Sequence, residues 1–347
     1  AMNSLLRKYR DLGYYPLPKS LAKEFVSLEG NPIKDKKAKT WWDHYEEFIE
    51  YKSKEIKDIR DYNNSLRKHL VHIEKSIGRK LRFEIIGDPE STFAEVWNRY
   101  LLYEAINSEG NPGLATNTAG KQNKNLKVFL NWCFDRNVTP RFSLKKFPAV
   151  QEDVDKVYVT DNEIEQIVQL ELDNTLEKTV RDLFVIGCET GLRFSDFSRI
   201  DVDDIQNNQI HFSPKKTKRY GNNKVIIPIS SRLDAILKKY NHVPPTFNQK
   251  GITQFNTTLR TICEKAGLTQ QIVRYRYIAG KEIKEVKSKF EEVSSHSCRR
   301  TFCTLKFLKG MPAQAIMKFS GHKTERNFLK YLKLDAELTA SKYGEFF

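Results

Sequence analysis

The chain has 347 residues, with 59 lysines and arginines against 44 aspartates and glutamates, so its formal net charge is +15. This length exceeds that of a typical domain with a single hydrophobic core, and therefore predicts two domains. The hydrophobic share of 39% excludes a chain that is disordered throughout. The longest apolar runs, such as residues 183–186, fall far short of the roughly 20 residues that span a bilayer.

The first ten residues contain no apolar signal region, which predicts a soluble, cytoplasmic protein. The isoelectric point near 9.4 predicts a polyanionic partner, most often nucleic acid. Five scattered cysteines do not form a disulfide framework. Because His296, Cys298 and Cys303 lack a CxxC knuckle, we expect no metal site.

In chain order, residues 1–38 mix cations with prolines and are interpreted as an N-terminal arm or linker remnant. Residues 39–150 predict a small helical bundle, because apolar side chains recur at helical spacing from Trp41 onward. A later helix carries Leu126 and Phe129 on one side. Its opposite surface contains Lys121, Lys124 and Asn125, which either face solvent or contact the phosphates of a nucleic acid.

Proline-punctuated residues up to about Val157 are interpreted as a linker. Thr160 and Glu163 then form a capping box, and a second helix is expected from about Leu176 to Cys188. Two hairpins are predicted, one over 209–230 with a cationic tip and one over 271–290. Helices are expected over 255–266, 297–309 and 312–319, and after His322. The fold class is therefore mainly α with small β-hairpins.

Four segments of the C-terminal half stand out together, because each contributes cations or hydrogen-bond donors. They are TGLRFSD (190–196), KKTK (215–218), SHSCRRTF (295–302) and GHKTERNFLKYL (321–332). The set contains no acidic cluster for magnesium, no glycine-rich phosphate loop and no Ser/His/Asp arrangement. Such residues are suited to surround a phosphate and attack it without a metal or cofactor.

These motifs resemble the tyrosine recombinase (phage integrase) family, and are closest in look to integrases of conjugative transposons and mobile elements. By that resemblance the catalytic residues are Arg193, Lys216, His296, Arg299, His322 and Tyr331, with Asp196 supporting Arg193. Lys215 and Lys218 are alternatives to Lys216 and, with Arg300, candidate DNA contacts. Cys298 stands where the family commonly has leucine, and is apolar enough to pack.

Each residue type suits the chemistry. A tyrosine hydroxyl, with a pKa of about 10, is a weak nucleophile, so the phosphodiester must be activated. Arginines stay charged and grip phosphate bidentately, which suits Arg193 and Arg299, while His322 would donate to the same phosphate. His296 would accept the tyrosine proton and Lys216 would protonate the departing 5′-oxygen.

The resemblance implies a SAM-like core-binding domain (39–150) and a catalytic domain with a C-terminal tail (157–347) that clamp DNA. It further implies dimers on inverted-repeat core sites, a tetrameric synapse, a 3′-phosphotyrosine intermediate, and accessory DNA-bending factors. The last residues would dock on a neighbouring protomer or fold on their own domain. A topoisomerase-like enzyme and a non-catalytic DNA-binding protein of the same fold remain alternatives.

Overall fold

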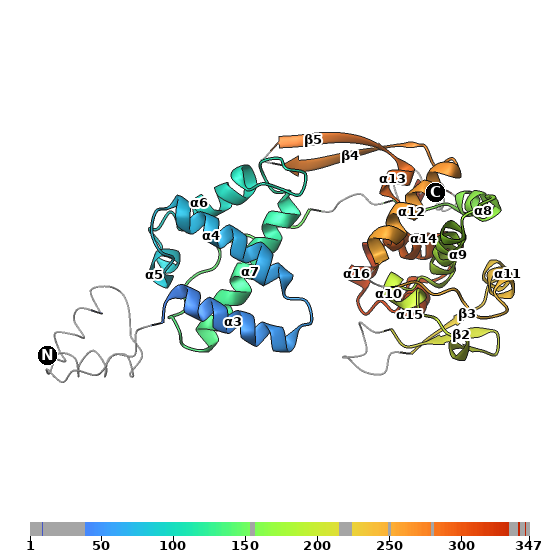
Figure 1. Ribbon diagram of the computed structural model, residues 1–347, viewed down its shortest axis with the longest axis horizontal. Coiled ribbons are helices and arrows are strands. Elements are labelled where there is room, and N and C mark those ends of the chain that lie inside the picture. The colour runs from blue at the N-terminus through green and yellow to red at the C-terminus, as the bar shows by residue number, and fades with distance from the viewer. Residues whose placement is uncertain are drawn as a thin grey trace. The chain divides into compact units, whose positions relative to one another are not determined.

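A computed structural model describes residues 39–152, 157–214, 224–248, 251–278 and 281–332, together with Tyr9, Thr339, Ala340 and Gly344. The chain divides into two compact units (Figure 1). The first unit comprises residues 1–153 and 276–283, and the second comprises residues 154–275 and 284–347.

The first unit is a bundle of short helices around an aromatic core. Its helical segments, of which η1 and η2 are π-helical, are α3 (Trp41–Glu55), η1 (Asp61–Leu66), α4 (Arg67–Ser76), α5 (Phe83–Gly87), α6 (Phe93–Arg99), η2 (Tyr100–Glu104) and α7 (Thr116–Asp135). Helix α3 begins where the Thr40 hydroxyl accepts from the backbone amide of Asp43, whose carboxylate accepts from the Thr40 amide. The aromatic rings of Tyr45 and Phe48 on α3 pack against Phe129 on α7.

Helix α7 is buried on more sides than its sequence indicates. Lys121 and Lys124 are exposed as expected, and Lys121 pairs with Asp61 at 2.8 Å. Asn125 is only 6% exposed, and its amide donates to the Asp61 carbonyl at 3.4 Å. The placement of Asn125 on the exposed surface was therefore wrong, because polar side chains here satisfy buried backbone groups.

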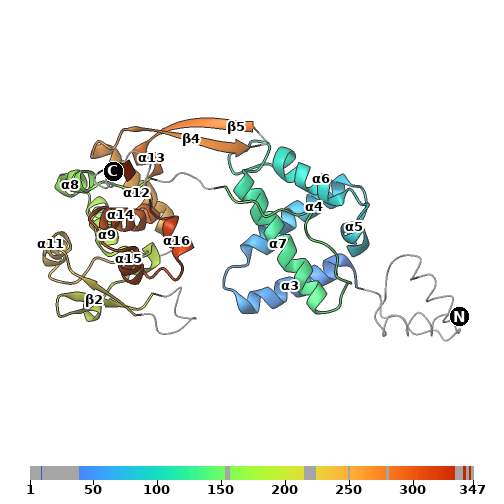
Figure 2. The ribbon, with the colours of Figure 1, turned by 180° about the vertical axis from the view of Figure 1, so that it is seen from behind.

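The second unit is built around helix α9. Its helical segments are α8 (Asp161–Gln169), α9 (Thr175–Thr190), α10 (Phe194–Phe197), the 3-10 turn η3 (Val202–Asp204), α11 (Ser231–Lys239), α12 (Ile252–Lys265), α13 (Lys289–Glu292), α14 (Ser295–Leu308), α15 (Ala313–Ser320) and α16 (Glu325–Leu329). Helix α9 is buried along most of its length and packs on α8, α11, α12 and α14 (Figure 2). Because α9 carries the first arginine motif at its end and α14 carries the second, their packing fixes both motifs.

Two small sheets accompany these helices. Strands β1 (Ile205–Gln206), β2 (Gln209–Phe212) and β3 (Val225–Pro228) form an antiparallel sheet in which Phe212 pairs with Val225. Strands β4 (Gln271–Ile278) and β5 (Lys281–Ser288) form a second, two-stranded sheet. Both predicted hairpins are thus confirmed, and β1 is an additional strand.

The expected fold class, mainly helical with small sheets, is confirmed. The capping box of Thr160 and Glu163 begins α8, and the helices expected over 255–266, 297–309 and 312–319 correspond to α12, α14 and α15. The cationic hairpin tip at 215–223, the arm at 1–38 except Tyr9, and most of the tail beyond Leu332 lie outside the described residues. Within the described part of the chain, no helix combines the length and apolarity needed to cross a membrane.

Candidate active site

A left-handed turn positions the first arginine. Helix α9 ends at Thr190, and Gly191 follows with φ +65°, a backbone conformation that residues other than glycine rarely adopt. A Cβ atom at Gly191 would lie 2.4 Å from the Phe302 ring on α14, so the close approach also requires glycine. This turn places half-buried Arg193 directly before α10, as its N-cap residue.

Asp196 is fully buried beneath this turn. One carboxylate oxygen accepts from Arg199 at 3.4 Å, and its backbone amide donates to the Arg193 carbonyl at 2.7 Å. Arg199 in turn lies over the Phe212 ring, 4.2 Å from its centroid. Asp196 therefore holds the turn that carries Arg193, while its expected support of the Arg193 guanidinium stays a prediction.

Arg299 is the second arginine, and it is only 1% exposed. Its Nη1 atom donates to the Gly191 carbonyl at 2.9 Å and to the Ser320 carbonyl, and its Nε atom donates to Nε2 of His322 at 3.2 Å. Among the described residues, Nη2 has no hydrogen-bond partner. Burial, aided by the charge of Arg193, lowers the pKa of Arg299 to about 10, so the guanidinium remains charged at neutral pH.

His322 is held by contacts to both ring nitrogens. Since Nε2 accepts from Arg299, the ring proton resides on Nδ1, which donates to the Ser320 hydroxyl at 2.7 Å. That hydroxyl donates to the Ile316 carbonyl at 2.7 Å. Burial, with the charges of Arg299 and Arg193, lowers the pKa of His322 to about 3, so the imidazole is neutral.

Tyr331 lies two residues beyond the end of α16, in a turn, so the helix expected after His322 is shorter than the sequence suggests. Its ring centroid is 4.7 Å from that of His322 and 5.4 Å from the guanidinium carbon of Arg299. The Tyr331 amide donates to the Phe328 carbonyl at 2.7 Å, and buried Phe328 anchors the turn. The structure therefore brings Arg299, His322 and Tyr331 together.

The other predicted site residues have different surroundings. His296 is exposed in the first turn of α14 and lines a cavity of about 470 Å³ that Tyr331 also lines. Arg300 is buried, and its guanidinium donates to the Val157 carbonyl at 2.9 Å and to the Ser297 hydroxyl at 3.2 Å. Lys215, Lys216 and Lys218 lie outside the described residues.

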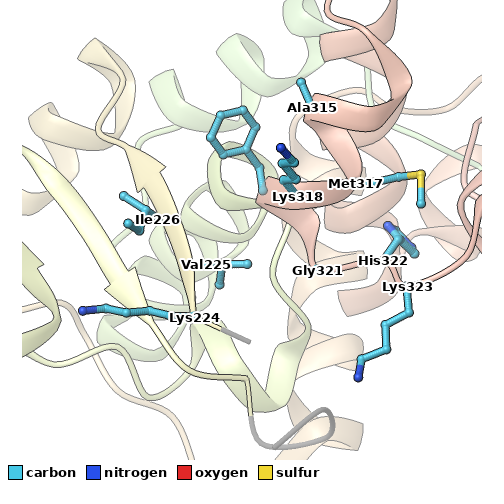
Figure 3. A pocket seen from close by; sticks show the side chains of 10 residues that line it. Lys224, Val225, Ile226, Ala315, Met317, Lys318, Gly321, His322 and Lys323 are labelled. Carbon is cyan, nitrogen blue, oxygen red and sulfur yellow. The ribbon is translucent and has the colours of Figure 1, made fainter. Parts of the chain in front are cut away.

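A second cavity, of about 720 Å³, is lined in part by His322 (Figure 3). In Figure 3, His322 and Lys323 follow the end of α15, and Lys224 lies on the side of β3. Lys318 is the third cation in its lining, which also contains apolar side chains such as Val225 and Met317. Sequence motifs did not single out these lysines, although Lys323 directly follows the GH motif.

Ser320 and Gly191 were likewise missed as site residues. The carbonyls of Gly191 and Ser320 accept from Arg299, which lies 108 and 21 residues away in sequence. The Ser320 hydroxyl contacts His322, and this contact depends on the bend after α15. The signals in the sequence were their positions, directly before the GH motif and inside the TGLR motif.

Comparisons with known proteins agree with the family resemblance of the motifs. The model of the phage integrase family matches residues 157–337. No curated protein sequence matches the chain. Among solved structures, the Tn1549 transposon integrase in complex with transposon right end DNA has a TM-score of 0.58 at 15% identity, covering 88% of this chain and 99% of that one.

Two structures of lambda integrase are also similar. A dimer bound to a COC′ core site has a TM-score of 0.57 at 13% identity, covering 85% of this chain and 96% of that one. A tetramer bound to a Holliday junction has a TM-score of 0.53 at 14% identity, covering 91% and 86%. These likenesses establish a shared fold, and the family match spans more than half of the chain, so this protein belongs to the phage integrase family of tyrosine recombinases.

Proposed function

We propose that the chain cleaves and rejoins DNA strands by attack of the Tyr331 hydroxyl on a scissile phosphodiester. The observation that carries this proposal is the Nη2 atom of Arg299, which is buried beside Tyr331 with no protein partner among the described residues. A buried donor left unpaired is costly, and a phosphate oxygen is a strong acceptor for it.

The electrostatics of the site favour an incoming anion. Burial and the charge of Arg193 lower the pKa of Arg299, which means that the two guanidinium groups repel each other in the free protein. A phosphate between them would convert this repulsion into attraction. Two guanidinium groups held on either side of the phosphate would also stabilise the additional negative charge of the transition state.

The reaction exchanges one phosphodiester for another. The bond from phosphorus to the tyrosine oxygen forms while the bond to the 5′-oxygen breaks, leaving a 3′-phosphotyrosine and a free 5′-hydroxyl. Attack of a 5′-hydroxyl on the phosphotyrosine reverses the step and rejoins a strand. Since the bonds are of similar energy, no external energy source is needed.

The reaction needs two proton transfers, one from the Tyr331 hydroxyl and one to the departing 5′-oxygen. His296 lines the same cavity as Tyr331 and would accept the proton of its hydroxyl, and Lys216 would protonate the 5′-oxygen. In the geometry described above, Nε2 of His322 accepts from Arg299 and so orients it. To donate to the phosphate as the resemblance implies, Nε2 would have to carry the proton and exchange Arg299 for a phosphate oxygen.

The substrate we propose is double-stranded DNA with inverted-repeat core sites, bound by dimers that assemble into a tetramer. The similar structures support this, since they hold an integrase with transposon end DNA, a dimer on a core site and a tetramer on a Holliday junction. Exposed Lys121 and Lys124 would contact backbone phosphates. Such a reaction would integrate or excise a mobile element, with accessory factors that bend the DNA.

Covalent trapping tests this function. Wild-type protein and the Tyr331→Phe variant are incubated with fragmented DNA of the source genome in EDTA and quenched with SDS, and protein-linked DNA is sequenced. Tyr275→Phe, which changes an exposed tyrosine on β4, is the matched control. We expect adducts at discrete sites with wild type and Tyr275→Phe, and none with Tyr331→Phe.

The products then identify the reaction. Joined partner duplexes indicate a recombinase, whereas only relaxed circles would indicate a topoisomerase-like enzyme. Tight, salt-sensitive DNA binding without any adduct would contradict the proposed chemistry and favour a non-catalytic DNA-binding protein.

A further inference from the structure

Half of the residues that line the cavity of about 470 Å³ beside Tyr331 are cations that the proposed reaction does not use. Its lining residues come from α12, β4, the α13–α14 region and the end of α16, and they are Arg260, Arg274, Glu292, Ser294, His296, Arg300, Lys330 and Tyr331. Arg193, Arg299 and His322 are not among them. The cavity is therefore adjacent to the site proposed for the scissile phosphate but separate from it.

The charge in this cavity is unbalanced. Four of the lining side chains are arginine or lysine, and Glu292 is the carboxylate among them. Glu292 pairs with Arg274 and lies 3.9 Å from Lys287, so its charge is already shared between two cations. The remaining cations have no opposite charge in the cavity lining.

Several donors in this cavity are unused. Arg260 and Lys330 are exposed, and within the described ranges of the chain neither side chain makes a hydrogen bond or an ion pair. The Nε atom of Arg274 is buried and likewise has no partner there. Burial lowers the pKa of Arg300, and the nearby charge of Arg274 lowers it further. These groups would be stabilised by an anion.

Helix α14 adds to this preference. Ser294 is its N-cap residue and His296 lies in its first turn, so the cavity lies at the positive end of a 14-residue helix. The amino end of a helix and a group of guanidinium and ammonium groups therefore face the same space, and both favour a phosphate.

We propose that this cavity, the Arg260 pocket, binds a backbone phosphate of DNA next to the scissile one, with Arg260, Arg274 and Lys330 as its ligands. This inference rests on the proposed function. Tyr331 and His296 belong to the wall of the pocket, so a strand whose scissile phosphate meets Tyr331 passes directly by it. Successive phosphates of a strand are one nucleotide apart, so a second phosphate lies next to the scissile one along the same strand.

The salt dependence of DNA binding tests the pocket without requiring cleavage. Binding of a mixed-sequence 30-base-pair duplex is measured by fluorescence anisotropy from 50 to 300 mM salt. The proteins are wild type, Arg260→Gln, Lys330→Gln and the double variant. Lys238→Gln on α11, which removes an exposed cation outside the pocket, is the control. Arg274 is left unchanged because its ion pair with Glu292 also connects β4 to α13.

If Arg260 and Lys330 share one phosphate, the double variant lowers the slope of log K against log salt by about 0.9, the value for one phosphate. Each single variant lowers it by part of that amount, and Lys238→Gln leaves it unchanged. An unchanged slope in the double variant overturns the proposal. A loss of about 1.8, the sum of two independent phosphates, also overturns it, because the two side chains would then not share a site.

A second measurement locates the phosphate and separates this proposal from the proposed function. A cleavage duplex recovered by trapping is synthesised with a neutral methylphosphonate at one position at a time. At one position beside the scissile phosphate, wild type and Arg260→Gln should form adducts at the same reduced rate. On the unmodified duplex we expect Arg260→Gln to form adducts more slowly than wild type. If this difference persists with the methylphosphonate at every position, the pocket proposal fails. If wild type forms no adduct on the unmodified duplex, the proposed function fails, and the salt slopes still decide the pocket.

Discussion

The Nε atom of Arg299 donates to Nε2 of His322 over 3.2 Å, and this contact fixes the tautomer of the histidine. Nδ1 then carries the ring proton and donates to the Ser320 hydroxyl oxygen, and that hydroxyl donates to the Ile316 carbonyl. Arg299 also donates to the carbonyl of Ser320. Ser320 is therefore a positioning residue. Its side chain orients His322 and its backbone carbonyl orients Arg299.

Replacing Ser320 by alanine should loosen His322 and, through it, Arg299. Loss of one hydrogen bond, about 1 kcal/mol, predicts a roughly fivefold slower rate of adduct formation. The tautomer of His322 is read from its ring ¹⁵N chemical shifts, which a merely destabilising substitution would not change in the folded protein. Ser231→Ala, at the exposed start of α11, is the control. Ring shifts identical to those of wild type would show that Ser320 does not hold the tautomer.

Acid should destabilise the folded chain through His322. Its pKa is lowered from 6.5 to about 3 on folding, so between these values the unfolded chain binds the proton more tightly. The contribution is constant above pH 6.5, and stability is lost as the pH falls from 6.5 toward 3. The loss attributable to this ring is at most about 1.4 kcal/mol per pH unit, and less where solvent screens it.

Urea unfolding at pH 7.5 and pH 5 measures this effect. We expect His322→Gln to lose less stability between the two pH values than wild type loses. His69 is a useful second case, because burial lowers its pKa to about 4. His69→Gln should therefore show the same sign of change, and an equal pH dependence in wild type and His322→Gln would contradict the neutral, buried imidazole.

Gly191 and Gly310 form a matched pair for testing the turn before Arg193. Both have positive φ, of +65° and +87°, so alanine at either position costs about 1–2 kcal/mol of backbone strain. A Cβ at Gly310 would meet nothing within 4 Å, whereas one at Gly191 would lie 2.4 Å from Phe302. Gly191→Ala should therefore be destabilised by a further 1–3 kcal/mol or so, measured by denaturant unfolding.

The same substitution should also impair cleavage, because the Gly191 carbonyl accepts from Nη1 of Arg299. Gly310→Ala should form adducts at the wild-type rate. Equal stability losses in the two variants would mean that the approach of α9 to α14 is looser than described.

The five cysteines should be unreactive in the folded protein. All are buried, and burial raises the pKa of the Cys133 and Cys303 thiols to about 12, so the thiolate fraction at pH 8 is on the order of 10⁻⁴. A charged disulfide reagent should release almost no chromophore from the native chain and five equivalents in denaturant. Rapid labelling of one native thiol would contradict this packing.

Local signals in the sequence predicted much of the fold. The capping box of Thr160 and Glu163 and the helix expected from about Leu176 to Cys188 depend on residues close in sequence, and both are as expected. The two hairpins were predictable because in each case two strand-like segments stand on either side of a polar stretch. The outward placement of Asn125 failed because polarity alone does not reveal a buried backbone carbonyl that needs a donor.

The motifs predicted which residues come together in the site. They did not predict the hydrogen bonds that hold those residues in place. Arg299, His322 and Tyr331 came from three separate patterns, and the structure brings them together. The role of Ser320 depends on the bend between α15 and the GH motif, which no local pattern specifies. Arg260 and Arg274 escaped notice because α12 and β4 are distant from the motifs in sequence and meet only in the folded unit.

The unpaired Nη2 of Arg299 also bears on how long the protein survives. A ligand that binds only the folded chain stabilises it by mass action, in proportion to the logarithm of its concentration above the dissociation constant. If DNA supplies the missing acceptor, molecules bound to it resist unfolding and proteolysis better than free ones do. Turnover would then remove free copies first, and the amount of the protein in a cell would follow the number of sites available to it.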